Sequence, residues 1–325
     1  MGKNLPAKKY KVGQRTERFL HYELEHTPDN ANDSHFIDIA AGLSAINKRF
    51  YRQGLYYYVK SISVVETSAD TVVRFGTAPD VWMVPQAWKL GFRNWSKMNS
   101  EAARAIPGGD LSIAGKYHDF KIFLNENHWD HHVANTDVTV PDNGPATMDG
   151  SPHFNPDDWE YSRYHSLHPD SGEPNNDGRD TFAAMLLGSH KENGTDDYDA
   201  ISLCKSYLAQ RTLSDTAGEP QQYDDMGDDP LLQLFDSANQ YDDIIDDLQD
   251  KNDRTPYDND GNYTDTIMRG QAFINGQNGN AILPGFCVPF GLLEVITKSV
   301  ADNTVKVIIE MAPGPYHGVY AERIS

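Results

Sequence analysis

The side chains best suited to hold a metal ion are histidines gathered in one short segment. His128, His131 and His132 lie in NENHWDHHVANTD, with Asp130 between them. Imidazoles three or four residues apart, joined by a carboxylate, can ligate a divalent metal. The segment has neither HExxH spacing nor a helical pattern. We therefore expect a polar surface loop, with a metal-dependent hydrolase as a minor alternative.

Two acidic turns resemble parts of calcium-binding loops. TPYDNDGNYTD contains Asp258 and Asp260 before a glycine, but Pro256 occupies the position of the first ligand. GEPNNDGRD contains Asp177 before a glycine, but Ala184 stands where an EF-hand loop has its bidentate glutamate. Turns built on Asx residues explain both segments. A structural Ca²⁺ held by Asp177, Asp258 or Asp260 stays open, and no other cofactor is expected.

The sequence has no motif for covalent or phosphoryl-transfer catalysis. A GxSxG nucleophile elbow, a P-loop, a GxGxxG and the protein-kinase signatures are all missing. Carboxylates are so numerous that no pair stands out as an acid–base couple. Cys204 and Cys287 are far apart in apolar segments, which argues against a disulfide framework or a zinc site. We expect a protein without catalytic residues.

The charge of the chain is strongly negative and unevenly distributed. The formal net charge of the 325 residues is −20, which excludes a protein that coats nucleic acid over its whole surface. Basic residues gather in residues 1–22 and acidic residues in 219–265. We expect residues 1–28 to form a flexible basic arm. The cations of this arm that could neutralise phosphates are Lys8, Lys9, Lys11, Arg15 and Arg18.

Most of the remaining sequence is strand-like, and no apolar run is long enough to cross a bilayer. Strands are predicted in HFIDIAAGLSAI, RQGLYYYVKSISVV, TVVRFGT, DFKIFLN, TIMRGQAFI, GFCVPFGLLEVITKS and TVKVIIEMA, with further apolar runs at 181–188 and 200–213. Asp302 and Asn303 predict a hairpin between the last two strands. Polar segments near 126–180 and 214–265 are expected as loop insertions. The pattern favours a sandwich or barrel, and specifically a jelly-roll β-sandwich with one or two short helices.

The segment APDVWMVPQAWKLGFRNWSKMN (78–99) predicts an amphipathic helix of about 15 residues, with Pro85 in its first turn. The aromatic residues spaced i, i+4 and i+7 on one face are Trp88, Phe92 and Trp95. The cations on an adjoining face are Lys89, Arg93 and Lys97. We expect the aromatic face to pack on a sheet. The residues expected in packing or assembly are Trp82, Trp88, Phe92, Trp95, Lys89 and Arg93.

The order of these segments resembles a known protein family. NKRFYRQGLYYYVKSISV followed by the tryptophan-rich segment is similar to capsid proteins of small circular, Rep-encoding single-stranded DNA viruses from environmental samples. The likeness continues at DFKIFLNENH, DLQDKNDRTPYDND and APGPYHGVYAERIS, and so covers most of the chain after residue 35. The residues that match the family's motif are Asn47, Arg52, Gln53, Gly54, Pro79, Trp82, Ala87, Trp88 and Trp95.

The resemblance implies a jelly-roll major capsid protein that self-assembles into an icosahedral shell around a single-stranded DNA genome. Residues 29–325 would form the capsid domain, with a double jelly roll as the alternative fold. The implied partners are other copies of the chain, packaged single-stranded DNA, minor capsid proteins and a host receptor, and the implied location is the virion. The competing hypothesis is a carbohydrate-binding or carbohydrate-active β-sandwich.

Overall fold

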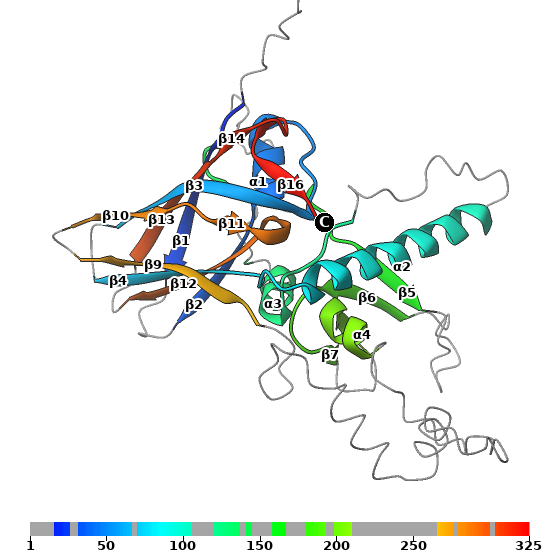
Figure 1. Cartoon of the computed structure of the whole chain (residues 1–325). Helices are drawn as coiled ribbons and strands as arrows, with labels where there is room; N and C mark the ends of the chain where they lie inside the picture. Colours follow the sequence, from blue (N-terminus) through cyan, green and yellow to red (C-terminus); the bar gives the residue numbers. More distant parts are fainter. Residues whose placement is uncertain are drawn as a thin grey trace, which may run out of the picture.

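Two facing β-sheets and a long insertion between two of their strands make up the described part of the chain (Figure 1). The computed structural model describes residues 16–26, 32–66, 70–105, 120–134, 136, 141–144, 158–166, 180–192, 198–209, 265–275, 278–299 and 303–324. The predicted mainly β fold is confirmed.

The first sheet has the strand order β1–β13–β3–β10, with bounds Phe19–His26, Asn303–Met311, Leu55–Val65 and Asn280–Pro284. Two short strands, β11 (Cys287–Val288) and β16 (Ala321–Arg323), also pair with β3. The second sheet has the order β2–β12–β4–β9, with bounds Asp33–Asp38, Leu292–Ser299, Thr71–Thr77 and Ile267–Ile274. All these pairs are antiparallel, and the chain changes sheet between successive strands of this set except from β4 to β9.

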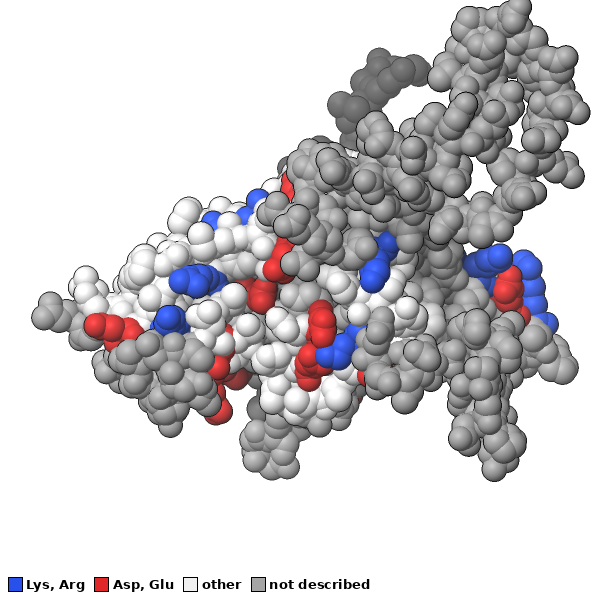
Figure 2. All heavy atoms as spheres, turned by 90° about the horizontal axis from the view of Figure 1, so that it is seen from below, with Lys and Arg blue, Asp and Glu red and all other residues white. Residues whose placement is uncertain are grey.

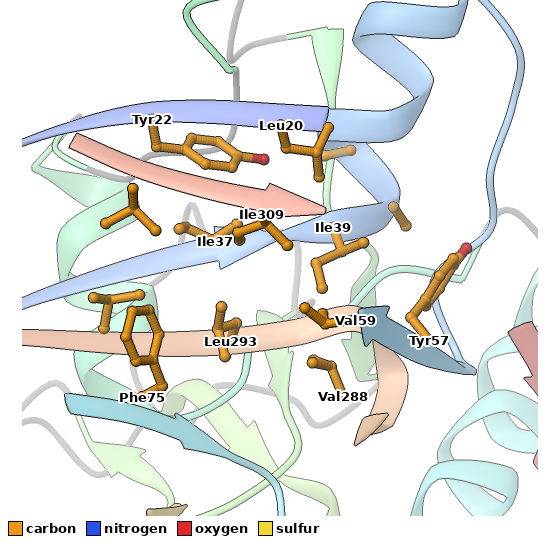
Figure 3. Packing of buried hydrophobic residues seen from close by; sticks show 14 of the residues in the cluster. Leu20, Tyr22, Ile37, Ile39, Tyr57, Val59, Phe75, Val288, Leu293 and Ile309 are labelled. Atoms are coloured by element: carbon orange, nitrogen blue, oxygen red, sulfur yellow. The ribbon is translucent and has the colours of Figure 1, made fainter. Parts of the chain in front are cut away.

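One apolar core lies between the two sheets. Leu20, Tyr22 and Leu24 alternate on β1 and are fully or almost fully buried. They belong to the same cluster as Phe75 and Leu293 of the opposite sheet, and Figure 3 shows these layers facing each other. Burying each side chain of this size contributes roughly 1.5–3 kcal/mol. The period of two along each strand therefore determines which face of each sheet is covered.

The described part of the insertion between β4 and β9 carries three helices and a small sheet. The helices are α2 (Met83–Ala105), α3 (Glu126–Val133) and α4 (Leu203–Ala209). The sheet order is β5–β6–β8–β7, with bounds Arg163–Ser166, Asp180–Met185, Tyr198–Ser202 and Lys191–Glu192. A second apolar cluster joins this insertion to the sandwich, because Trp88 and Phe120 pack with Phe36 and Phe290. Figure 1 shows α2 crossing this region and extending beyond it.

The prediction of a strand throughout HFIDIAAGLSAI is wrong after Asp38. Residues Ile39–Asn47 form helix α1, because the Asp38 carboxylate accepts hydrogen bonds from the backbone N–H groups of Ala40 and Ala41. This is an N-terminal cap that ends the strand and begins the helix. The apolar run at 200–213 likewise changes from strand β8 to helix α4 after Ser202. Four α-helices occur in the described residues, instead of the one or two predicted.

The polar loop predicted to begin at residue 126 begins instead with helix α3. Asn125 caps this helix by accepting a hydrogen bond from the backbone N–H of His128 at 3.0 Å. The His128 ring is buried and stacks on Phe36 with a centroid distance of 4.9 Å. The prediction failed because an imidazole can pack in a core as an aromatic ring. Before this helix, the predicted strand DFKIFLN is reduced to an isolated bridge at Phe123.

The hairpin predicted at Asp302 and Asn303 is also wrong. Strand β12 pairs with β2 and β4, whereas β13 pairs with β1 and β3, so the connection joins two different sheets. Each of these two strands pairs with two strands that are distant in the sequence. A local turn pattern carries no information about such partners. The remaining short elements of the described residues are η4 (Pro289–Gly291), β14 (Pro313–Gly314) and β15 (Gly318–Val319).

The arm boundary predicted at residue 28 lies too far along the chain. Phe19–His26 form β1, which pairs with β13 along its whole length. Residues 1–15 lie outside the described residues, as does 210–264, which holds most of the second predicted insertion. The first predicted insertion, near 126–180, contains α3 and β5.

Candidate functional site

The candidate site is built on a buried carboxylate at the end of β2. Oδ1 of Asp38 accepts from the N–H groups of Ala40 and Ala41 at 2.9 and 3.1 Å. Its Oδ2 accepts from Gln53 Nε2 and Trp159 Nε1, each at 2.9 Å. Burial raises the pKa of Asp38 to about 6. The four hydrogen bonds that the carboxylate accepts act in the opposite direction and lower this pKa, but their effect is smaller. Asp38 therefore links three parts of the chain through hydrogen bonds, namely helix α1, the segment that leads into β3, and the insertion.

Gln53 extends this network to the segment before α3. Its Nε2 donates to the carbonyl oxygen of Ile122 at 3.0 Å, and the N–H of Ile122 donates to Oε1 at 2.7 Å. Gln53 is fully buried, so both halves of its amide are satisfied without water. The adjacent residue Phe123 then exchanges backbone hydrogen bonds with Ala184 and Leu186 of the insertion. These hydrogen bonds thus fix the position of the insertion relative to the sandwich.

A groove of about 320 Å³ opens beside Trp159. Its walls are the last turn of α1, the residues that follow this helix, and parts of the insertion. The lining side chains that carry charge or an aromatic ring are Lys48, Arg49, Phe50, Lys121, Asp158 and Trp159. Three cations and one carboxylate make the groove locally positive in a chain of net charge −20.

Two stacked rings form the floor of this groove, which we call the Phe50–Trp159 platform. Phe50 is 44% exposed, and its ring centroid lies 5.8 Å from that of Trp159 at an interplanar angle of 26°. The ammonium of Lys121 lies 4.4 Å from the Trp159 centroid and 5.6 Å from that of Phe50, within cation–π range. Because Asp38 holds the Trp159 indole, the platform has a fixed orientation.

Trp159 also lines a second hollow, of about 370 Å³, within the insertion. Aromatic side chains form much of its wall, and carboxylates border it. The lining residues that matter chemically are Phe123, Trp129, Trp159, Tyr161, Glu160 and Asp199. The wall thus combines aromatic rings with polar and charged side chains, which small-molecule sites use to orient a ligand. We call this space the aromatic hollow.

The predicted aromatic face of α2 is confirmed. Trp88 and Trp95 are 0% and 8% exposed, and Phe92 stacks on Trp88 at 5.8 Å. All three rings lie around Phe120 of the insertion. The helix has 23 residues and is longer than predicted. Trp82 precedes the helix and is 47% exposed, and an assembly contact through it stays a prediction.

The predicted cations of α2 lie away from the groove lining. Lys89 is half-buried, whereas Arg93 and Lys97 are exposed. Lys97 lies 3.9 Å from Glu101, one turn further along the helix. Figure 2 shows Lys and Arg gathered with an acidic side chain at the far end of α2, while the two signs are interspersed over the sandwich. An assembly contact through Lys89 and Arg93 stays a prediction.

Several predicted site residues lie outside the described residues. They are Lys8, Lys9, Lys11, Arg15, Asp177, Asp258 and Asp260. Arg18 is described and directly precedes β1, where its carbonyl oxygen accepts a hydrogen bond from Met311. Within the described ranges, no group of three or more His, Cys, Asp and Glu side chains could hold a metal ion.

Comparison with protein-family models finds no matching family, and searches of curated proteins and of solved structures return no significant match. None of the helices in the described ranges is both long and apolar enough to cross a membrane.

The groove was not predicted from the sequence, although some of the residues that line it are consecutive in the chain. Lys48, Arg49 and Phe50 are consecutive and lie inside the family-like segment NKRFYRQG. Two cations beside an aromatic residue are a weak pattern on their own. Lys121 and Trp159, which complete the groove, come from distant parts of the chain. The hydrogen bonds of Asp38 and Gln53 help to bring them together in the folded chain.

Proposed function

We propose that this chain is the major capsid protein of a small single-stranded DNA virus, a jelly-roll subunit that assembles into an icosahedral shell. The observation that carries this proposal is the strand order, β1–β13–β3–β10 facing β2–β12–β4–β9. A jelly roll is an arrangement of eight antiparallel strands in two facing sheets, with repeated crossings between them, and it is common in viral capsid and lectin domains. The described residues contain one such set, which favours one jelly roll over two.

The family-like motif supports a shell subunit over other jelly-roll functions, because its residues meet as a structural unit. Gln53 binds Asp38 and Ile122, and the neighbouring Gly54 packs under the indole of Trp88. The motif thus attaches the insertion and α2 to the sandwich. Gln53, Gly54 and Trp88, three of the residues that carry the resemblance, are thus accounted for by architecture, as expected of a protein whose work is assembly.

Exposed apolar side chains on the last strand of each sheet supply a surface for subunit contact. On β9, Met268 and Phe273 are 63% and 71% exposed, and on β10 Ile282 is 69% exposed. Strands β9 and β10 contact each other. Single exposed apolar residues are common on monomers, but three on two neighbouring strands favour burial against a partner. We assign that partner to a second copy of this chain.

Electron microscopy of the purified full chain, combined with size-exclusion chromatography, tests the proposal. We expect closed particles of uniform diameter over some range of salt and Ca²⁺ concentration. A chain that stays monomeric under every such condition contradicts a shell protein. Ca²⁺ is included because the acidic segments with Asp177, Asp258 and Asp260 are candidate ligands between subunits.

A carbohydrate-binding jelly roll is the second candidate, and the aromatic hollow favours it. Trp129 is partly exposed and offers a ring on which a sugar can lie, while Glu160 and Asp199 offer acceptors for hydroxyl groups. A glycan array with the unassembled chain tests this function. Binding that is lost in Trp129→Ala, in a chain that forms no particles, would replace the capsid proposal with the carbohydrate one.

A further inference from the structure

We propose that the groove beside the Phe50–Trp159 platform binds one nucleotide unit of a single-stranded nucleic acid. The base stacks on the exposed part of Phe50, and Lys48 and Arg49 hold its phosphate. The volume of about 320 Å³ lies at the small end of the range for ligand sites, roughly 300–1,000 Å³. This inference rests on the proposed function only for the source of the strand, a packaged genome.

The aromatic part of the groove has the chemistry of a base-stacking surface. One face of Phe50 is covered by Trp159, and the side chain nevertheless remains 44% exposed. A flat ring placed against the exposed part of Phe50 would remove this apolar surface from water. Stacking of bases on aromatic side chains tolerates any sequence, because every base has a π-face.

The charged part of the groove favours an anion beside that ring. Lys48 ends α1 in the left-handed region, with φ of +50°, and this turn places Lys48, Arg49 and Phe50 together on the groove wall. Neither Lys48 nor Arg49 forms an ion pair with an acidic residue in the described part of the chain. Cations next to an exposed ring match a nucleotide better than an acidic peptide, which brings no planar base.

The groove is formed before any ligand binds. Trp159 is held by Asp38, and the backbone of Lys121 exchanges hydrogen bonds with Ser162 at 2.8 and 3.0 Å. On the α1 side, the hydroxyl of Ser44 accepts from the N–H of Tyr51 at 2.9 Å, which fixes the chain after Phe50. A site whose walls are already ordered loses little conformational entropy on binding.

Fluorescence anisotropy of a labelled oligothymidylate with the unassembled full chain tests the inference. Phe50→Leu keeps an apolar side chain on Trp159 but removes the ring, and we expect about 10-fold weaker binding or more. Phe50→Tyr keeps the ring and should retain the affinity. Lys48→Gln combined with Arg49→Gln should weaken binding and reduce the slope of log affinity against log salt by roughly 0.7, the value for one neutralised phosphate on a single strand.

Matched controls separate the groove from general attraction to a polyanion. Tyr198→Leu removes a ring of similar exposure, 42%, on β8. Arg93→Gln combined with Lys97→Gln removes the same charge from α2. Thermal melting of each variant verifies that it is folded. Controls that weaken binding as much as the groove variants overturn the inference, as does binding that is unchanged in Phe50→Leu.

Thymidine monophosphate, used as a competitor, distinguishes a strand from a free nucleotide. We expect it to compete far more weakly than the unlabelled oligonucleotide, because a strand also contacts cations outside the groove. Equal competition per molecule overturns the assignment to a strand. Particle formation is read separately by electron microscopy. Particles without groove-dependent binding overturn this inference alone, whereas groove-dependent binding without particles overturns the proposed shell alone.

Discussion

The indole of Trp88 lies directly against Gly54. A β-carbon at Gly54 would lie 2.9 Å from Cε2 of Trp88 and closer still to Cζ2. Gly54 also has φ of +80°, in the left-handed region that side chains disfavour. Trp88 is fully buried, so the indole has no room to move aside. Helix α2 can therefore pack at the start of β3 only where residue 54 has no side chain.

Gly54→Ala should lower the free energy of unfolding by about 2–4 kcal/mol, through overpacking against Trp88 and backbone strain together. Chemical denaturation monitored by circular dichroism measures this loss. Gly188→Ala is the matched control, because Gly188 has φ of +84° but nothing within 4 Å of an added β-carbon. It should cost only about 1 kcal/mol. Equal losses at the two positions would mean that the Trp88 contact is unimportant.

Asp38→Asn should lower the free energy of unfolding by about 2–4 kcal/mol. The asparagine oxygen can still cap α1, but its amide N–H₂ would face the donors of Gln53 and Trp159. Two buried donors would then lose their acceptor, at roughly 1–3 kcal/mol each.

Asp38→Ser separates the cap from the rest of this network. Its hydroxyl can cap the helix but cannot also accept from Gln53 and Trp159, so most of the loss should remain. Urea denaturation of both variants provides the measurement. If Asp38→Ser were as stable as the unaltered chain, the carboxylate would serve only as a cap.

Acidification should destabilise the chain through His190. Burial lowers the pKa of this imidazole from 6.5 to about 4, and its Nδ1 accepts the N–H of Ser202 at 3.0 Å. The unfolded chain binds a proton below pH 6.5 that the folded chain excludes until about pH 4. The contribution of neutral His190 to the free energy of unfolding is therefore complete above pH 6.5, and it is lost as the pH falls towards 4.

Because the ring is partly exposed, we expect a loss of only about 1–2 kcal/mol. His190→Gln keeps an acceptor without a titrating group and should flatten this part of the stability profile. His35, whose pKa burial also lowers to about 4, contributes equally in both proteins and cancels from the difference. Identical profiles for His190→Gln and the unaltered chain would contradict the assignment.

Phe273→Asp combined with Ile282→Asp should abolish particle formation and leave a folded subunit. Both side chains are about 70% exposed, so the substitutions remove little of the core. Charges at a subunit contact would be buried without partners on assembly, which is strongly unfavourable. Light scattering and electron microscopy measure assembly, and thermal melting measures the fold.

Val133→Asp is the control for this experiment, because Val133 is 59% exposed at the end of α3, away from β9 and β10. The chain with Val133→Asp should form particles as the unaltered chain does. Normal particles from the Phe273→Asp, Ile282→Asp chain would show that β9 and β10 are not the contact surface.

Local sequence patterns predicted the elements whose signal is contained in a few neighbouring residues. Strand β4 follows the alternation of TVVRFGT, and α2 follows the spacing of Trp88, Phe92 and Trp95. These patterns work because a strand or helix repeats its buried face at a fixed period. The same periodic patterns did not predict α1, because Asp38 ends a strand and caps a helix within one apolar run.

The sequence by itself determined that the chain is mainly β, which face of α2 is buried, and where the charge is concentrated. Tertiary structure alone decided that β12 and β13 belong to different sheets, that His128 is a core side chain, and that Trp159 reaches Asp38. The physical reason is that strand partners, buried hydrogen bonds and the groove walls join residues distant along the chain. Periodicity specifies which side of an element is apolar, but packing selects what covers it.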